Sequence, residues 1–260
     1  MASRPPSLLF AGAWLLGGFA LWRSGAKWLG AGSVAQGVQE LLGYRDRAPQ
    51  PKVLGAGGGL GESLSEAAAR VSGGAKTKST KRYVKNIDER VAIIRDLTRK
   101  SSQEPTVRDR AHAILNRKCG TPGNEHWCVT EKNSEEEIRA IFWAFKDPKS
   151  PFGIRYTRDH VAIDQFSTAE KILKNRAADC DEAVVVLGAH LMAIGMPVKL
   201  RVIRTKDSRE FNHIYLLVGL GPTGTPKRWK PLDLTVNKTP GWEPPPSMVA
   251  AVKDYDVPLL

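Results

Sequence analysis

Cysteine is scarce in this sequence: its 260 residues include only three, at positions 119, 128 and 180. Three cysteines cannot all pair within one chain. This excludes a fold held together mainly by disulfides and leaves at least one thiol free for chemistry or metal binding. Apolar residues are not in excess either. They make up 42% of the chain and charged residues 25%, which excludes both a multi-pass membrane protein and a wholly disordered chain.

Phosphate-binding and nucleic-acid-binding motifs are also missing. The three glycines at 57–59 lack the Lys-Ser/Thr pair of a phosphate-binding loop, and no Gly-x-Gly-x-x-Gly follows a predicted strand. Acidic residues are too few to balance the basic ones: the net charge is +12, and residues 1–82 carry 11 Lys and Arg against 4 Asp and Glu. Such a surplus suits nucleic acid, anionic lipid or an acidic protein. Without a nucleic-acid motif or a basic stripe interleaved with aromatic residues, sequence-specific nucleic-acid binding is not expected.

The N-terminal region, residues 1–47, contains an uncharged apolar run of sixteen residues at 7–22. A membrane-spanning helix needs about 20 apolar residues, so this run is marginal. It is interpreted as a membrane anchor, a signal peptide, or a helix buried against another protein. If it spans a bilayer, Arg23, Lys27 and the basic run at 76–82 favour a cytoplasmic position for the C-terminal side.

The next two segments have contrasting compositions. Residues 48–82 are rich in Gly, Ala, Ser and Lys, cannot bury much apolar surface, and are predicted to be a flexible linker. Residues 83–133 are predicted to be a helical lead-in, because apolar residues recur at helical spacing from Ile87 to Leu97 and from Val107 to Leu115. The lead-in closes with a predicted loop at 116–131.

A change of period marks the following domain, predicted to cover 134–246. Capping boxes at Ser134/Glu137 and Ser167/Glu170 predict two helices, and residues 179–194 form a strongly apolar third helix before Gly195 and Pro197. After residue 197 the period falls to two, which predicts strands at 198–204, 211–218 and 228–234. Helices followed by an antiparallel meander predict an α+β fold, with 247–260 as a C-terminal tail.

Three side chains on these elements could perform nucleophilic catalysis. Cys180 lies at the start of the apolar helix, His213 within the second strand, and Asp233 at the end of the third. A helix N-terminus lowers a thiol pKa, an imidazole accepts the thiol proton, and a carboxylate orients the imidazole. Acidic residues 179, 181 and 182 act in the opposite direction, because they raise the thiol pKa.

Four sequence segments resemble a known family. Residues 178–182 (ADCDE) with 187–197 (LGAHLMAIGMP) resemble the G-D-C-x-[DE] and L-x-x-x-G-[IV]-P signature of transglutaminase-like domains. Residues 211–215 (FNHIY) resemble that family's [NS]-H-x-[WY] strand, and 232–235 (LDLT) its L-D-[PL]-T strand end. The resemblance covers 135–242 and is closest to small bacterial and phage members. Ala178, where the family usually has Gly, and Leu234, often Pro, depart from the pattern.

The resemblance implies a papain-like core and a cysteine enzyme acting through a thioester. Cys180 would be the nucleophile, His213 the general base and then acid, and Asp233 its orienting partner. The substrate would be a protein or peptide, the acyl acceptor water or an amine, and no cofactor or metal would be needed. The backbone N–H of Cys180 is one candidate oxyanion donor; Trp143 and Gln165 are candidates for the second.

Two alternatives to this reading stay open. Such domains also occur in phage-related gene sets, so the protein could be a non-enzymatic virion or assembly protein that docks on a partner through 7–22. It could also be a membrane-anchored peptidase of the cell envelope. The corresponding locations are a membrane, with the C-terminal domain on the cytoplasmic side, or a virion.

A second cluster combines His112, Cys119, His126 and Cys128. Zinc uses such ligands, but structural sites normally pair their cysteines more closely than these two, which are separated by eight residues. A disulfide between Cys119 and Cys128 is the other alternative. Two free thiols in a loop are the default expectation.

Overall fold

The computed structural model describes residues 78–82, 84, 86–121, 124–130, 133–157, 164–221 and 225–259. The N-terminal apolar segment and nearly all of the expected linker lie outside these residues. Among the described residues, no helix combines the length and the apolar composition that a membrane span requires.

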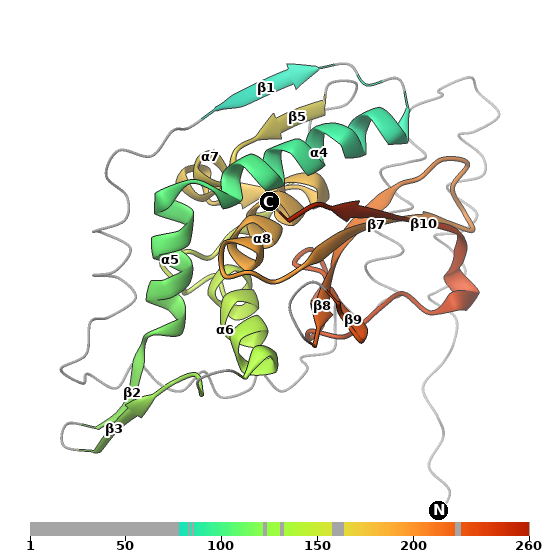
Figure 1. Ribbon diagram of the computed structural model, residues 1–260. Coiled ribbons are helices and arrows are strands. Elements are labelled where there is room, and N and C mark those ends of the chain that lie inside the picture. Colours follow the sequence, from blue (N-terminus) through green and yellow to red (C-terminus); the bar gives the residue numbers. More distant parts are fainter. Residues whose placement is uncertain are drawn as a thin grey trace, which may run out of the picture. The chain divides into compact units, whose positions relative to one another are not determined.

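The chain is a mixed α+β fold, as the change of period predicts (Figure 1). Its helices are α4 (Ile87–Ser102), α5 (Pro105–Leu115), α6 (Ser134–Lys146), α7 (Ala169–Asn175), α8 (Cys180–Ala193) and the short 3-10 helix η1 (Pro246–Met248). Its strands are β1 (Ser79–Arg82), β2 (Lys118–Thr121), β3 (Asn124–Trp127), β4 (Arg155–Tyr156), β5 (Asp164–Ser167), β6 (Ala177–Ala178), β7 (Val198–Thr205), β8 (His213–Leu220), β9 (Arg228–Leu232) and β10 (Val249–Val257).

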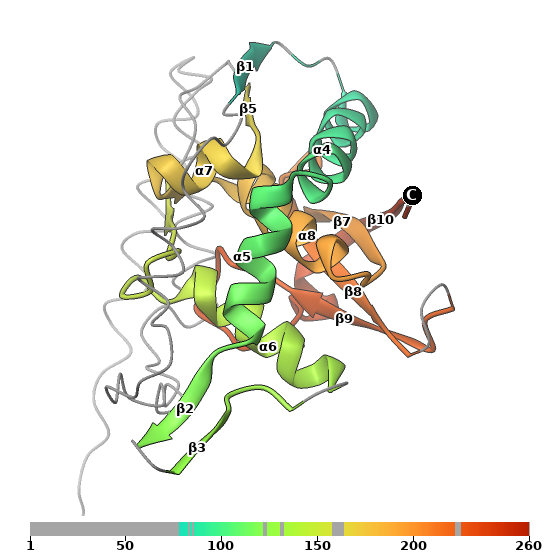
Figure 2. The ribbon, with the colours of Figure 1, turned by 60° about the vertical axis from the view of Figure 1, so that its left-hand side comes forward.

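Helix α8 is the centre of the fold. It contacts α4, α5, α6 and α7 as well as β8, and lies between these helices and the larger sheet (Figures 1 and 2). Residues 181–192 of α8 are all buried, which explains why its sequence is apolar on every face. Gly188 permits this packing, because a Cβ there would lie 2.8 Å from Thr98 Cγ2 of α4 and 3.2 Å from Leu216 Cδ1 of β8.

The helices of the expected lead-in share the core of the expected domain. Val91 of α4 and Val107 of α5 are fully buried in the same cluster as Ile138 and Leu187. A buried polar network adds to this contact: Arg110 of α5 donates to both carboxylate oxygens of Glu170 of α7, at 2.6 and 3.0 Å. Residues 86–115 are therefore structurally continuous with the elements that carry the candidate site.

The larger sheet has the strand order β10-β7-β8-β9 and is antiparallel throughout. Strands β7, β8 and β9 agree with the predicted strands to within two residues at each end. The predicted tail at 247–260 is wrong for most of its length, because β10 pairs with β7 from Val249↔Thr205 to Val257↔Val198. β10 is a half-exposed edge strand with three charged residues among its nine, so its sequence lacks the apolar alternation of a typical strand.

No strand is predicted from the sequence at the positions of β1, β2 and β3. The predicted loop at 116–131 contains the antiparallel β2–β3 hairpin, which projects beyond α5 (Figures 1 and 2). The last four residues of the predicted linker form β1, which pairs with β5. These strands are short and mostly exposed, so burial leaves no pattern in their sequences.

The two predicted capping boxes are also corrected. The side chain of Asn133, one residue earlier than expected, accepts the N–H of Glu136 and caps α6. Helix α7 begins at Ala169, and its N-cap Thr168 makes no side-chain cap bond. Ser167, the expected cap, bonds Ser79 Oγ through its own hydroxyl at 3.2 Å, because β1 lies beside it.

Candidate active site

Cys180 is the first residue of α8, as the sequence predicts. The preceding Asp179 is the N-cap: its Oδ1 accepts the N–H of Glu182 at 2.8 Å. Cys180 is half-buried, and its thiol is not part of a disulfide. A side chain at this position lies next to helix N–H groups that have no partner within the helix, which is the electrostatic setting of many nucleophilic cysteines.

His213 and Asp233 are held together across neighbouring strands. His213 opens β8, Asp233 directly follows β9, and Nε2 of the imidazole lies 2.7 Å from Oδ2 of the carboxylate. The second carboxylate oxygen, Oδ1, accepts the backbone N–H and the hydroxyl of Thr235, at 2.8 and 2.7 Å. Both oxygens of Asp233 are thus engaged, which fixes the carboxylate and, through it, the orientation of the imidazole.

The electrostatics of this pair match an orienting carboxylate. Burial would lower the pKa of His213, but Asp233 outweighs it and the pKa lies above its ordinary value. Burial would likewise raise the pKa of Asp233, yet the bonds from His213 and Thr235 leave that pKa below its ordinary value. Asp233 is therefore ionised when His213 is protonated, and the ion pair stabilises the imidazolium.

Cys180 borders two small hollows, one shared with each residue of this pair. One hollow is lined by Cys180 together with Asp233 and residues of β8 and β9; the other is lined by Cys180 together with His213 and residues of α4 and β7. The structure therefore gathers all three predicted residues at one place. Among the hydrogen bonds of the described residues, however, none joins Cys180 Sγ to His213. The thiol instead lies 3.6 Å from Asp181 Oδ1 and donates to it.

The surroundings of the thiol disfavour its ionised form. Its pKa lies well above the ordinary value because it is buried and because Asp181, Asp179 and Asp233 disfavour a thiolate, while Arg90 acts in the opposite direction. The sequence argument that acidic neighbours raise this pKa holds for Asp179 and Asp181. Catalysis by this thiol requires its proton to move to His213 as the sulfur reacts.

Two cationic residues that sequence reasoning missed also contribute to the site. Arg90 of α4 lies 3.7 Å from Asp181 Oδ2 and lines the hollow that Cys180 shares with His213. Lys146, the last residue of α6, donates from Nζ to the carbonyl of Leu234 at 2.7 Å and so anchors the turn that carries Asp233. Neither position shows a sequence signal, because each depends on how distant helices pack.

The two candidates for a second oxyanion donor are not brought to the sulfur. Trp143 and Gln165 line neither of the hollows that Cys180 borders. Trp143 instead packs edge-on against Phe142 within α6. Helix periodicity could not show whether Trp143 lies near the Cys180 sulfur. It indicates which face of α6 a residue is on, but not how far that face is from a site on another element.

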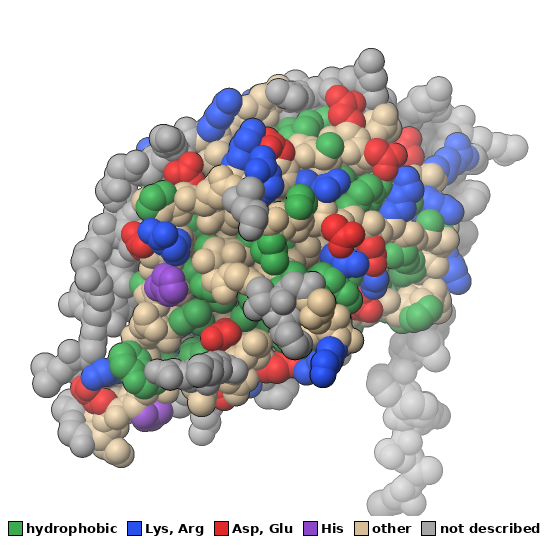
Figure 3. Space-filling model, in the orientation of Figure 1, with side chains coloured by type: hydrophobic (Ala, Val, Ile, Leu, Met, Phe, Trp, Pro, Cys, Tyr) green, Lys and Arg blue, Asp and Glu red, His purple; other side chains and the backbone are tan. Residues whose placement is uncertain are grey.

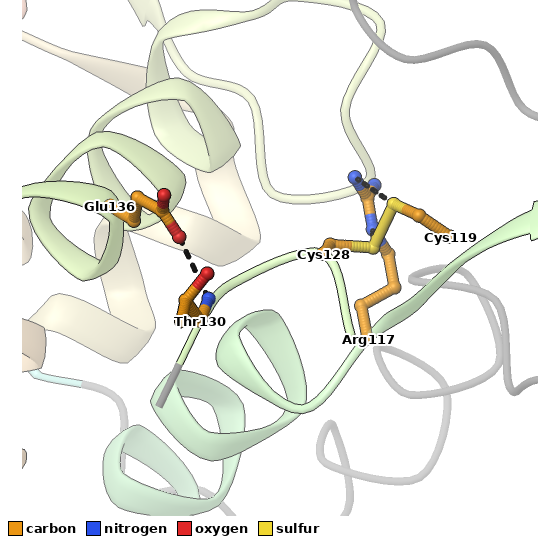
Figure 4. Close-up of a disulfide and its surroundings, with 5 residues drawn as sticks. All are labelled: Arg117, Cys119, Cys128, Thr130 and Glu136. Atoms are coloured by element: carbon orange, nitrogen blue, oxygen red, sulfur yellow. Dashed lines mark hydrogen bonds between the residues drawn. A yellow bond between two sulfur atoms is a disulfide. The ribbon is translucent and has the colours of Figure 1, made fainter. Parts of the chain in front are cut away.

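The second cysteine cluster is a disulfide, so the expectation of two free thiols is wrong. Cys119 and Cys128 are bonded across the β2–β3 hairpin, whose pairing brings their Cα atoms to 5.1 Å (Figure 4). Arg117 lies against both sulfur atoms, with its Nε 3.2 Å from Cys128 Sγ. Both sulfurs are thereby unavailable as thiolate ligands, and no group of three or more His, Cys, Asp or Glu in the described residues is arranged to hold a metal ion.

Basic and acidic side chains are mixed on the one face of the molecule that Figure 3 draws, where Lys and Arg are interspersed with Asp and Glu.

No protein-family model matches the sequence, and no curated protein is significantly similar to it. The observations that bear on function are therefore the geometry around Cys180 and the motifs that carry it.

Proposed function

We propose that residues 134–246, together with α4 and α5, form a transglutaminase-like cysteine acyltransferase with a papain-like core. The proposal depends above all on one observation: the His213–Asp233 bond of 2.7 Å lies beside a cysteine at a helix start. A thiol, an imidazole and an orienting carboxylate are the three groups that acyl transfer through a thioester requires. The substrate is a protein or peptide that presents an amide.

The reaction proceeds in two balanced steps. In the first, Cys180 Sγ attacks the amide carbon while His213 accepts the thiol proton. The C–N bond then breaks, and His213 returns the proton to the leaving amine. In the second, water or an amine attacks the thioester carbon, His213 accepts its proton, and the C–S bond breaks to regenerate the thiol. The backbone N–H of Cys180, at the positive end of α8, stabilises the oxyanion in both steps.

The resting geometry implies a rearrangement before chemistry. The thiol must turn from Asp181 towards the ring nitrogen of His213 that does not bond Asp233. Hydrogen bonds of catalytic groups are commonly long or misaligned without substrate and tighten in the reactive complex. Rotation about one side-chain bond of Cys180 is a small movement compared with the loop closures that many enzymes use.

A non-enzymatic role is the second candidate, and the Asp181 contact favours it. A thiol that donates to a carboxylate and has a raised pKa is a poor nucleophile. In this reading the domain docks a partner, such as a virion or assembly component. The β2–β3 hairpin would be a suitable contact, because its Trp127 is 53% exposed.

The hairpin disulfide also bears on location. Disulfides persist in oxidising compartments and on virion or cell surfaces, and are rare in the cytosol. The Cys119–Cys128 bond supports a location outside the cytoplasm, such as the cell envelope or a particle surface, over the cytoplasmic orientation that the basic residues near 23–27 favour.

The test compares the full chain with three variants. Wild type, Cys180→Ala, His213→Ala and the control His112→Ala, which replaces an exposed histidine of α5, are incubated with glutamine-containing peptides, with and without a fluorescent primary amine. Ammonia release and amine incorporation are measured. Turnover by wild type and His112→Ala only is expected. Equal turnover by wild type and Cys180→Ala would contradict the proposed nucleophile. No turnover by any protein, together with binding of a particle component by Cys180→Ala, would support docking instead.

A further inference from the structure

Asp181 stands between the thiol and a cation from a different helix. Its Oδ1 accepts the Cys180 thiol at 3.6 Å, and its Oδ2 lies 3.7 Å from Nη1 of Arg90. Asp181 is only 4% exposed, and the Arg90 side chain is 35% exposed. A carboxylate buried to this extent needs a compensating charge, and α4 supplies one.

The other charged groups around the sulfur are committed elsewhere. Asp179 caps α8 through Glu182, and Asp233 is bonded to His213 and Thr235. Among the carboxylates that act on the thiol, Asp181 is thus the one with a bond to the sulfur itself. Asp181 also interacts with His213, whose pKa it raises. Its position therefore affects both partners of the proton transfer.

We propose that Asp181 and Arg90 are a pair of positioning residues: Asp181 holds the Cys180 thiol in a resting orientation in which it bonds Asp181 rather than His213, and Arg90 moderates this hold. This inference depends on the proposed function only for its consequence in catalysis. Asp181 retains the thiol hydrogen, and Arg90 limits the strength of that hold by neutralising the carboxylate. Helix α4 thereby acts on the nucleophile of a site built on α8, β8 and β9.

The position of α4 makes the pair adjustable. Asp88 lies in the first turn of α4, two residues before Arg90. Its carboxylate accepts the Tyr255 hydroxyl at 2.5 Å and lies 3.3 Å from Lys253 Nζ. The N-terminal turn of α4 is thus tied to β10 at the edge of the sheet. A substrate or partner that shifts this turn would move Arg90 relative to Asp181 and change the reactivity of Cys180.

The direction of each substitution follows from the charges. Asp181→Asn removes the negative charge beside the sulfur and leaves Arg90 to favour a thiolate, so the thiol pKa falls. Arg90→Gln removes the cation, so that pKa rises. At a pH below the thiol pKa, a change of one in that pKa alters the thiolate fraction about tenfold. Because nucleophilicity falls with pKa, the alkylation rate at fixed pH changes by only about threefold per unit.

The experiment measures alkylation by iodoacetamide between pH 5.5 and 9.5, followed by intact mass. Cys180 is the one cysteine outside the disulfide, so a single adduct reports on it. The full chain is compared with Asp181→Asn and Arg90→Gln, and with the controls Asp96→Asn and Arg99→Gln, which alter a half-buried pair elsewhere on α4. Asp181→Asn is expected to move the midpoint to lower pH and to react about threefold faster or more at pH 7; Arg90→Gln is expected to do the reverse.

Profiles for Asp181→Asn and Arg90→Gln that coincide with their controls would overturn the inference, as would a shift to higher pH for Asp181→Asn. Circular dichroism verifies folding, and Arg90→Met, which removes the charge but keeps an unbranched side chain and is expected to raise the midpoint, replaces Arg90→Gln if that variant unfolds. A shifted midpoint in a protein that turns over no amide would uphold the pair and contradict the proposed function. Turnover by wild type with unshifted midpoints would do the opposite.

Discussion

Two histidines of this chain lie beside charged groups of opposite sign, one in the helical core and one at the candidate site. His190 is fully buried in α8; its Nε2 is 3.3 Å from Arg110 Nη1 and its Nδ1 is 2.7 Å from the Val186 carbonyl. Burial and Arg110 lower the pKa of His190 to about 3. At His213, Asp233 outweighs burial and raises the pKa above its ordinary value.

The difference shows that the sign of the neighbouring charge, rather than burial, decides what a histidine can do. His190 stays neutral and acts as a fixed connection among α5, α7 and α8. His213 can accept a proton and keep it, as a general base must. The following substitutions should separate these two roles, because the core network affects stability and the site affects reactivity.

The largest effect is expected at the site. Asp233→Asn removes the charge that stabilises the imidazolium and favours the wrong tautomer of His213. The rate of amide turnover should fall by about 10³- to 10⁴-fold, the scale seen when a triad loses its carboxylate. Initial rates at saturating peptide provide the measurement, with Asp256→Asn at an exposed position of β10 as the control. A loss of tenfold or less would mean that Asp233 does not orient His213.

The core network should respond in stability instead. Glu170→Gln leaves the guanidinium of Arg110 buried without a counter-charge, which should lower the free energy of unfolding by about 3–5 kcal/mol. Urea unfolding followed by circular dichroism measures this. The double variant Arg110→Met/Glu170→Leu should recover part of the loss. If the single variant is as stable as wild type, the pair does not hold α5 against α7.

The hairpin disulfide should give a smaller effect. Replacing Cys119 and Cys128 by serine removes a short cross-link, for which chain entropy predicts a loss of up to about 2–3 kcal/mol. Urea unfolding and the rate of tryptic cleavage within 117–128 report it. Iodoacetamide reactivity of Cys180 should stay unchanged, since the hairpin contributes no residue to either hollow. A changed Cys180 profile would show that the two regions are coupled.

The smallest expected effect is in the pH dependence of stability. Because the pKa of His190 is about 3 in the folded chain and about 6.5 when unfolded, the unfolded state binds the extra proton below pH 6.5. Stability from this group is full above that value and falls by about 2 kcal/mol at pH 5. The pKa of His213 is raised, so its contribution is present below pH 6.5 and is lost as pH rises through the folded value.

Urea unfolding at pH 5 and pH 7 tests this contrast. His190→Gln should lose less stability than wild type on going from pH 7 to pH 5, whatever its absolute stability. Because the pKa of His213 is raised, wild type gains stability from this group when the pH falls. His213→Gln should lack that gain. Equal pH slopes in the three proteins would mean that neither histidine has the environment described above.

Sequence reasoning predicts the elements whose burial is strongly patterned. The apolar run at 179–194 gives α8 almost to the residue, and the change of period after residue 197 gives β7 and β8. Cys180 and Asp233 could be identified because each lies at an element boundary that the pattern defines, and His213 because it lies within the second predicted strand. The roles assigned to these three residues stay predictions until their chemistry is measured.

The missed features all depend on tertiary pairing. β10 carries the charges of an edge strand and is recognisable only through its partner β7. The Cys119–Cys128 bond, which the sequence leaves open as one alternative, depends on the register of a hairpin without an apolar face. Arg90 reaches Asp181 because α4 packs on α8, and no spacing along the chain relates positions 90 and 181. Exposed and long-range features leave little trace in a single sequence.

The most direct measurement of the central claim is acylation of Cys180 itself. The full chain is mixed with p-nitrophenyl acetate, quenched in acid at increasing times, and its intact mass is recorded. Wild type and His112→Ala should gain one acetyl group on Cys180 at equal rates, Cys180→Ala should gain none there, and His213→Ala should react at least about 100-fold more slowly. If His213→Ala is acylated as fast as wild type, the imidazole does not activate this thiol and the account is contradicted.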